Sequence, residues 1–243
     1  MRRTDTHYHL DQVPDPLGLL HRCERDQLAL ITPSMNPASY RELLALQAKS
    51  STILQVACGL HPESIHADEE IEEALNLART AQAVGEVGLP CYERKVTKRD
   101  VQVFTKFCRV AADENKALIV HAVHDQAEPA LEVMLDCGVR KAVFHWLKAN
   151  ARVASRIVAC GYMVSVTPEV TYRKRDQDLL RLIPKSQLLL ETDGPWEHQG
   201  PYQGKASIPH WIDDAAQYAA AVYGCSLSSW WEQHEQNVDR LFF

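Results

Sequence analysis

The chain has 243 residues, of which 46% are hydrophobic, with a formal net charge of −6 and seven scattered cysteines. This length suits one large domain or two small ones, and the composition allows a sizeable core. The acidic balance argues against a protein that coats nucleic acid through bulk positive charge. No apolar run approaches the roughly 18 residues that span a bilayer, so we expect no membrane contact. The start of the chain has no apolar leader, and we expect no signal peptide. The cysteines are odd in number and dispersed, which together with this leads us to expect a cytoplasmic protein with reduced thiols.

Strand-like apolar segments alternate with helix-like segments along the chain. The predicted strands are 2–9, 27–33, 52–60, 81–89, 117–123, 141–147, 161–168 and 187–195. Apolar residues recur every three or four positions in predicted helices at 37–50, 69–81, 98–116 and 127–138, and a helical region at 207–224 and 227–243 ends the chain. This alternation predicts an α/β fold, a single-domain (β/α)8 TIM barrel over residues 1–243. A doubly wound open sheet is the alternative.

Polar residues gather at the carboxyl ends of the predicted strands. His7 and His9 are two residues apart on the first strand, so both side chains are predicted to point to the same side. Later strand ends carry His61, Glu86, His121, His124, His145 and Asp193. A barrel collects its strand ends in one bowl, whereas an open sheet spreads them along an edge, so this distribution favours the barrel.

Each of these residues also has a purely structural explanation. A lone buried histidine is more often a hydrogen-bonded core residue, Glu86 could pair with an arginine, and Asp193 could cap a helix. Their combination is hard to explain in this way, because each buried polar group costs stability unless it is satisfied. Two divalent metal ions would satisfy them together. The histidine count favours Zn²⁺, and mixed imidazole and carboxylate donors also suit Mn²⁺ or Mg²⁺.

The ordered motifs of the chain resemble those of a known family. The segments "DTHYHLD", "GLHPE", "GEVGLP", "IVHAVH", "FHW" and "LLETDGPW" look like the serial signatures of TatD-type metal-dependent hydrolases, which are amidohydrolase-like (β/α)8 barrels. The likeness extends to "NVDRLF" near the C-terminus and so covers nearly the whole chain. A His-x-His pair alone is a weak signal, whereas the ordered set of six motifs is specific.

The resemblance implies a role for each matching residue. It implies six metal ligands: His7, His9 and Asp193 for a first metal, His121 and His145 for a second, and Glu86 as the bridge between them. Asp193 would also be the catalytic general base, and His61 would contact the substrate through a phosphate oxygen. The chemistry is coherent, because metal ions lower the pKa of bound water and a second ion stabilises the leaving oxygen.

Three departures from the usual family motifs indicate a divergent subgroup. Pro90 stands where common members have Asp. The fifth strand ends in "HAVH", so Val123 occupies the usual arginine position and His124 follows it, either as a replacement substrate contact, as a spare ligand or as a solvent-facing residue. The usual "HCFSG" is replaced by "HWLKAN". All six implied ligands are retained, so the changes bear on the choice of substrate.

Two basic segments and one long loop follow strand ends. Residues 92–100 and 171–177 bring Arg94 and Arg173, which we expect to bind substrate at the mouth of the bowl. Other basic and aromatic residues of the two segments are Lys95, Arg99, Lys174, Arg175, Tyr92 and Tyr172. The alternative is that both are solvated first turns of helices. The Gly- and Pro-rich loop 194–211 is predicted to form one wall of the cleft.

The leading functional hypothesis is a two-metal phosphodiesterase, a deoxyribonuclease that uses metal-activated water and Asp193 as general base. Its expected substrate is DNA or another phosphodiester. A metallohydrolase of a small amide, ester or lactone is the alternative, which Val123 favours and the basic segments disfavour. A catalytically inactive metal-binding or partner-binding barrel is the third, and the retention of all candidate ligands argues against it. The oligomeric state stays open.

Overall fold

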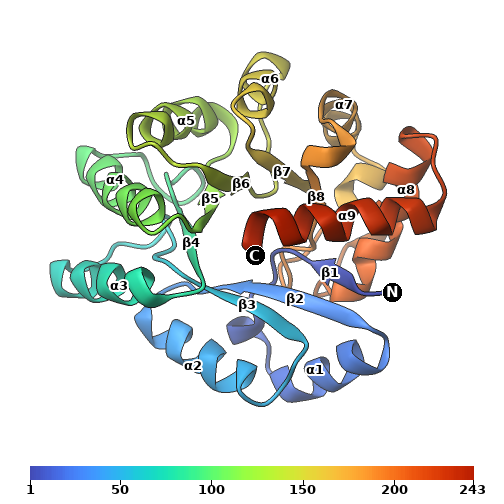
Figure 1. The fold of residues 1–243 in the computed structure, drawn as a ribbon, viewed down its shortest axis with the longest axis horizontal. Coiled ribbons are helices and arrows are strands. Elements are labelled where there is room, and N and C mark those ends of the chain that lie inside the picture. The colour runs from blue at the N-terminus through green and yellow to red at the C-terminus, as the bar shows by residue number, and fades with distance from the viewer.

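Eight parallel strands pair in sequence order, from β1 to β8, in the computed structural model, which describes residues 1–243 (Figure 1). Their bounds are β1 Arg3–Asp5, β2 Leu28–Pro33, β3 Ile53–Cys58, β4 Ala83–Gly88, β5 Ala117–His121, β6 Lys141–Phe144, β7 Met163–Val166 and β8 Leu188–Leu190. Each strand is shorter than its predicted segment, at the amino end, at the carboxyl end or at both.

The first and last strands are joined by the residues that follow them. The amide of Thr6 donates to the carbonyl of Leu190 at 3.1 Å, and the amide of Asp193 donates to the carbonyl of His7 at 3.0 Å. Tyr8 and Gly194 form a parallel bridge one step further along. These bonds close the ring, and the predicted single-domain (β/α)8 barrel is confirmed as the fold class.

Eight helices surround the ring and a ninth, α9, runs across it, as Figure 1 shows. They are α1 Pro16–Arg25, α2 Pro37–Gln47, α3 Asp68–Thr80, α4 Lys98–Asp113, α5 Ala127–Asp136, α6 Ala151–Ala159, α7 Lys174–Leu182, α8 Ile212–Val222 and α9 Leu227–Phe242. Side chains cap several of their first turns: Asp15, Asn36 and Thr97 each accept the amide of the residue three positions on. None of the helices is both long and apolar enough to cross a membrane.

The core has two layers. The larger layer packs the outer faces of the strands against the helices. The smaller layer fills the barrel interior, where residues such as Ile31 and Ile119 form one cluster with Val238, Leu241 and Phe242 of α9. Figure 1 shows α9 running across the ring with the C-terminus near its centre. Because α9 closes the amino-terminal end of the strands, the carboxyl-terminal end is left for a binding site.

Candidate metal centre

Six polar side chains converge at the carboxyl ends of five strands. They are His7, His9, Glu86, His121, His145 and Asp193, and all six are buried. His7 and His9 lie just beyond β1, in the extended segment that pairs with the residues after β8, so the prediction that they lie within a strand is corrected by two to four residues. Gly88 permits the close approach of β4 to β5, because a Cβ there would collide with the carbonyl oxygen of His121.

Four of these residues form one tight group of donor atoms. His7 Nε2 lies 3.2 Å from Glu86 Oε2 and 3.4 Å from Asp193 Oδ1. His9 Nε2 lies 3.3 and 3.4 Å from the same two oxygens, and the two imidazole nitrogens are 3.2 Å apart. A tetrahedron of ligands around zinc, with bonds of about 2.0 to 2.1 Å, has edges of about 3.3 to 3.4 Å. The group therefore has the dimensions of a metal coordination sphere.

The second group shares the carboxylate of Glu86. The other oxygen, Oε1, lies 2.7 Å from His121 Nδ1 and 2.7 Å from His145 Nε2, and these two nitrogens are 3.3 Å apart. His61 Nε2 lies 3.7 Å from the same oxygen. Each oxygen of Glu86 thus faces a different pair of histidines.

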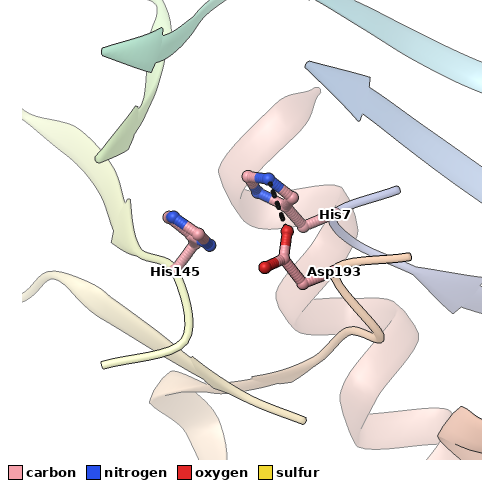
Figure 2. A group of neighbouring side chains, drawn as sticks. All are labelled: His7, His145 and Asp193. Atoms are coloured by element: carbon pink, nitrogen blue, oxygen red, sulfur yellow. Dashed lines mark ion pairs between the residues drawn. The ribbon is translucent and has the colours of Figure 1, made fainter. Parts of the chain in front are cut away.

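The arrangement of the donor atoms is better explained by bound divalent cations than by hydrogen bonds among the side chains. Glu86 Oε2 and Asp193 Oδ1 are buried without a hydrogen-bond partner, which is costly for a carboxylate. Figure 2 shows His7, His145 and Asp193 pointing toward one another from three strand ends, and their donor atoms lie within 4.8 Å of each other. Imidazole nitrogens and carboxylate oxygens that converge in this way match the donor set of zinc and related ions.

Burial and neighbouring charge act in opposite directions on two histidines of the centre. Burial alone would lower the pKa of His9, but the nearby carboxylates of Asp193 and Glu86, with oxygens 3.4 and 3.3 Å from Nε2, raise it to about 10. His61 has less compensation, and burial lowers its pKa to about 4. His61 is therefore neutral at pH 7 and offers one donor and one acceptor to whatever enters the site.

Two carboxylates that the sequence analysis did not single out lie behind the second histidine pair. Glu191 Oε1 is 3.5 Å from His145 Nδ1, and Glu63 Oε1 is 3.4 Å from His121 Nε2. Carboxylates in this position fix the orientation of a ligating imidazole and raise its basicity. Both stand inside the quoted motifs, in "GLHPE" and "LLETDGPW", two residues from His61 and Asp193. That spacing is the signal that could have identified them.

Glu63 also holds the loop that follows β4. Its carboxylate accepts the amides of Cys91, Tyr92 and Glu93 at 2.6 to 2.9 Å. Burial alone would raise the pKa of Glu63, but the hydrogen bond from His121 and these three amides lower it to about 2. The ionised carboxylate therefore ties the loop to the metal centre.

The centre opens into a pocket of about 590 Å³. His61 lines it, as do Tyr92, Trp146, Lys148 and Trp196. Trp196 brings the start of the loop 194–211 to the pocket, while Tyr202 and Trp211 of the same loop pack against each other, with ring centroids 4.5 Å apart, outside it.

Three predicted substrate-binding residues do not line this pocket. The guanidinium of Arg94 pairs with Asp100 at 2.6 and 2.9 Å. Arg173 donates to Glu169 at 2.8 Å and to Gln199 at 3.2 Å. His124 lies in a separate depression. The structure thus places His61 beside the candidate metal ligands, and it places Arg94, Arg173 and His124 outside the lining of the pocket. The two arginines are held there by nearby carboxylates and, for Arg173, by the amide oxygen of Gln199.

Replacement of Arg94 by alanine is expected to lower the free energy of unfolding by about 1 to 3 kcal/mol, because it leaves Asp100 without its bidentate partner. The Arg94 side chain also donates to the carbonyl oxygens of Glu63 and Ser64. Chemical denaturation measures the change, and Lys95→Ala, on the exposed side of the same loop, should stay within about 0.5 kcal/mol of the wild type. Unchanged stability with a raised KM for DNA would instead support the substrate-binding role.

Comparison with known proteins agrees with this geometry. The family model described as TatD related DNase matches residues 4–243. The chain belongs to the TatD-related DNase family. This TatD-family chain is 30% identical over 227 residues to the metal-dependent hydrolase YjjV of Escherichia coli, covering 86% of this chain and 85% of YjjV. It is 26% identical to TATDN3 of mouse, a protein named for a proposed deoxyribonuclease activity, covering 98% and 87% of the two chains.

A solved structure shows the same fold. The crystal structure of YjjV superimposes with a TM-score of 0.87 at 23% identity, covering 98% of this chain and 97% of that one. The TatD-family protein is therefore a metal-dependent hydrolase whose candidate metal site is the buried His, Glu and Asp cluster at the carboxyl end of the barrel.

Proposed function

We propose that the protein hydrolyses phosphodiester bonds of DNA with two divalent cations held by the six converging side chains. One observation carries the proposal: the two oxygens of Glu86 each face a separate pair of imidazole nitrogens, at 2.7 to 3.3 Å. A carboxylate placed in this way could bind one cation through each oxygen and so hold two cations side by side. The histidine-rich donors favour Zn²⁺, with Mn²⁺ and Mg²⁺ as alternatives.

Two cations bound there would supply an activated water at neutral pH and would stabilise the charge that develops on the phosphate oxygens. Asp193 is the proposed general base. Its Oδ1 faces His7 and His9 at 3.4 Å, which leaves Oδ2 to accept the proton of the attacking water. His61, neutral at the pocket wall, is the proposed donor to a phosphate oxygen.

The pocket supports a substrate that enters by its end. A volume of about 590 Å³ accommodates a ligand about the size of one nucleotide. Tyr92 and Trp196 at its rim are 52% and 48% exposed, and such rings provide stacking surfaces for bases. Because these contacts are tolerant of sequence, we expect cleavage near strand ends with little base preference.

Hydrolysis of a small amide, ester or lactone is the second candidate function. The observation that favours it is the scarcity of basic residues in the pocket, where buried Val123 forms part of the wall and Lys148 is the one lysine or arginine among the lining residues. A barrel without activity is disfavoured, since all six donor side chains are present and converge.

The test is hydrolysis by protein loaded with Zn²⁺, Mn²⁺ or Mg²⁺, assayed on end-labelled single-stranded DNA, blunt duplex DNA, circular single-stranded DNA, RNA, bis-p-nitrophenyl phosphate and a panel of small esters. The proposal expects shortening of linear single strands, resistance of circular DNA and loss of activity after chelation. Failure to cleave any DNA, together with turnover of a small ester, would replace the nuclease by the second candidate.

A further inference from the structure

Lys148 has an unusual environment for a lysine. Its Nζ lies 3.6 Å from the centroid of the Trp146 ring and donates to the hydroxyl of Tyr92 at 2.6 Å. No carboxylate oxygen lies within 4.0 Å of it. The residue belongs to the "HWLKAN" segment, one of the departures from the usual family motifs, and it lines the pocket above the metal centre. A cation is therefore held by aromatic groups without an ionic partner.

Lys148 stays mostly protonated at neutral pH, although burial disfavours its charged form. Burial lowers its pKa to about 8, a change that Arg175 reinforces and that the negative charges of Asp193 and Glu169 oppose. The cation–π contact with the face of the Trp146 ring offsets part of the free energy that the ammonium group loses with its hydration. An anionic ligand in the pocket would supply the charge partner that this partly buried cation lacks.

The Tyr92 hydroxyl adds a second donor beside Lys148. It accepts a hydrogen bond from Lys148, so its own proton stays free to donate. A tyrosine hydroxyl keeps its proton at neutral pH, and partial burial raises the pKa of Tyr92 further, to about 12. The three backbone amides bound by Glu63 fix the loop that carries Tyr92. Two neighbouring donors with fixed positions match a ligand that only accepts, such as a phosphate oxygen.

The pair of donors lies next to the metal centre. The ring centroid of Tyr92 is 6.1 Å from that of His121, one of the candidate metal ligands, and Nζ of Lys148 is 5.1 Å from the Tyr92 centroid. Lys148 also follows His145, another candidate ligand, by three residues. An anion at Lys148 and a second one at the metal centre would therefore be neighbours in the same pocket.

We propose that Lys148 and the Tyr92 hydroxyl bind a second anionic group of the substrate, beside the phosphate that is cleaved. The substrate class is then a phosphate ester with an adjacent phosphate, such as a nucleotide unit that carries phosphates on both sides. This inference rests on the proposed function for the identity of the cleaved group, while the anion site itself depends only on the geometry of Lys148, Tyr92 and Trp146.

The test compares the affinities of thymidine 3′,5′-bisphosphate and thymidine 5′-monophosphate for the metal-loaded protein by calorimetry, with the recovered ligands checked for intact phosphates. The second phosphate should increase affinity about 10- to 100-fold in the wild type. Lys148→Met should abolish this increment and Lys148→Arg should keep most of it. Lys205→Met removes one charge from an exposed position in the loop after β8 and should leave the increment unchanged.

The outcomes separate this inference from the proposed function. An increment that depends on Lys148, in a protein that cleaves no phosphodiester, would support the anion site and reject the nuclease. Equal increments in wild type and Lys148→Met would overturn the anion site, even if the protein cleaves DNA. An increment lost equally in Lys148→Met and Lys148→Arg, with unaltered thermal unfolding, would also overturn it, because a charged replacement should restore an ionic contact.

Discussion

Replacement of Glu86 by glutamine is expected to lower the bound metal from the proposed two divalent ions per chain to fewer than one. Glu86 is fully buried, and each of its oxygens faces a separate pair of histidines, so a neutral amide weakens both coordination groups at once. Hydrolysis of bis-p-nitrophenyl phosphate should fall by about three orders of magnitude or more, since metal ions supply several kcal/mol of transition-state stabilisation. Elemental analysis after dialysis measures the metal, and a colorimetric assay measures the rate.

Glu235→Gln is the matched control for this variant. Glu235 lies on α9, the helix that closes the other end of the barrel. Its buried carboxylate accepts hydrogen bonds from Thr4 of β1 through both oxygens and pairs with Arg2. Its replacement should reduce stability and leave the metal content at two ions. If Glu86→Gln keeps two tightly bound ions, or if the wild type binds none, the assignment of Glu86 as a bridge is wrong.

The barrel could be predicted from sequence because its signals are local and repeated. Each strand is a short apolar run followed by a helix with apolar residues every three or four positions, and the register of parallel neighbours places all carboxyl ends on one face. The strand ends were less predictable. His7 and His9 lie beyond β1 because Tyr8 bridges to Gly194 to close the ring, a contact between residues far apart in the chain that no local pattern reveals.

The convergence of the donor side chains follows from the same logic. His121 and His145 are polar residues that directly end or follow apolar strands, so a barrel brings them together whatever the intervening loops do. Arg94 and Arg173 are side chains on loops, and their direction depends on nearby carboxylates. Asp100 and Glu169 are those partners, and a count of basic residues in a segment says nothing about which charges are already paired.

The proposed anion site at Lys148 could not be predicted from the sequence. In the sequence, Lys148 is only one residue of the altered "HWLKAN" motif. Its proposed role in binding an anion depends on Tyr92, which approaches it from the loop after another strand. The position of Tyr92 depends in turn on the carboxylate of Glu63. Such chains of contacts connect three loops, so they require the folded structure to be seen.

Replacement of Asp193 by asparagine is expected to reduce hydrolysis by roughly two to four orders of magnitude in metal-replete protein, the usual size of a general-base loss. The fold should survive. Asp193 has a left-handed backbone, with φ of 52°, and asparagine tolerates this conformation well while keeping nearly the same volume. The amide can still approach His7 and His9 but cannot accept the proton of water, so kcat should fall much more than KM rises.

The variant must be assayed with its metal content measured, because Asp193 is also a candidate ligand, with Oδ1 3.4 Å from both His7 and His9. Asp176→Asn provides the comparison, since Asp176 is equally buried but pairs with Arg175 and lies outside the pocket. It should lose stability and keep its rate. If Asp193→Asn loses one ion and regains full turnover when metal is added, the residue acts as a ligand alone. Near wild-type turnover in a fully loaded variant would show that Asp193 is not the general base.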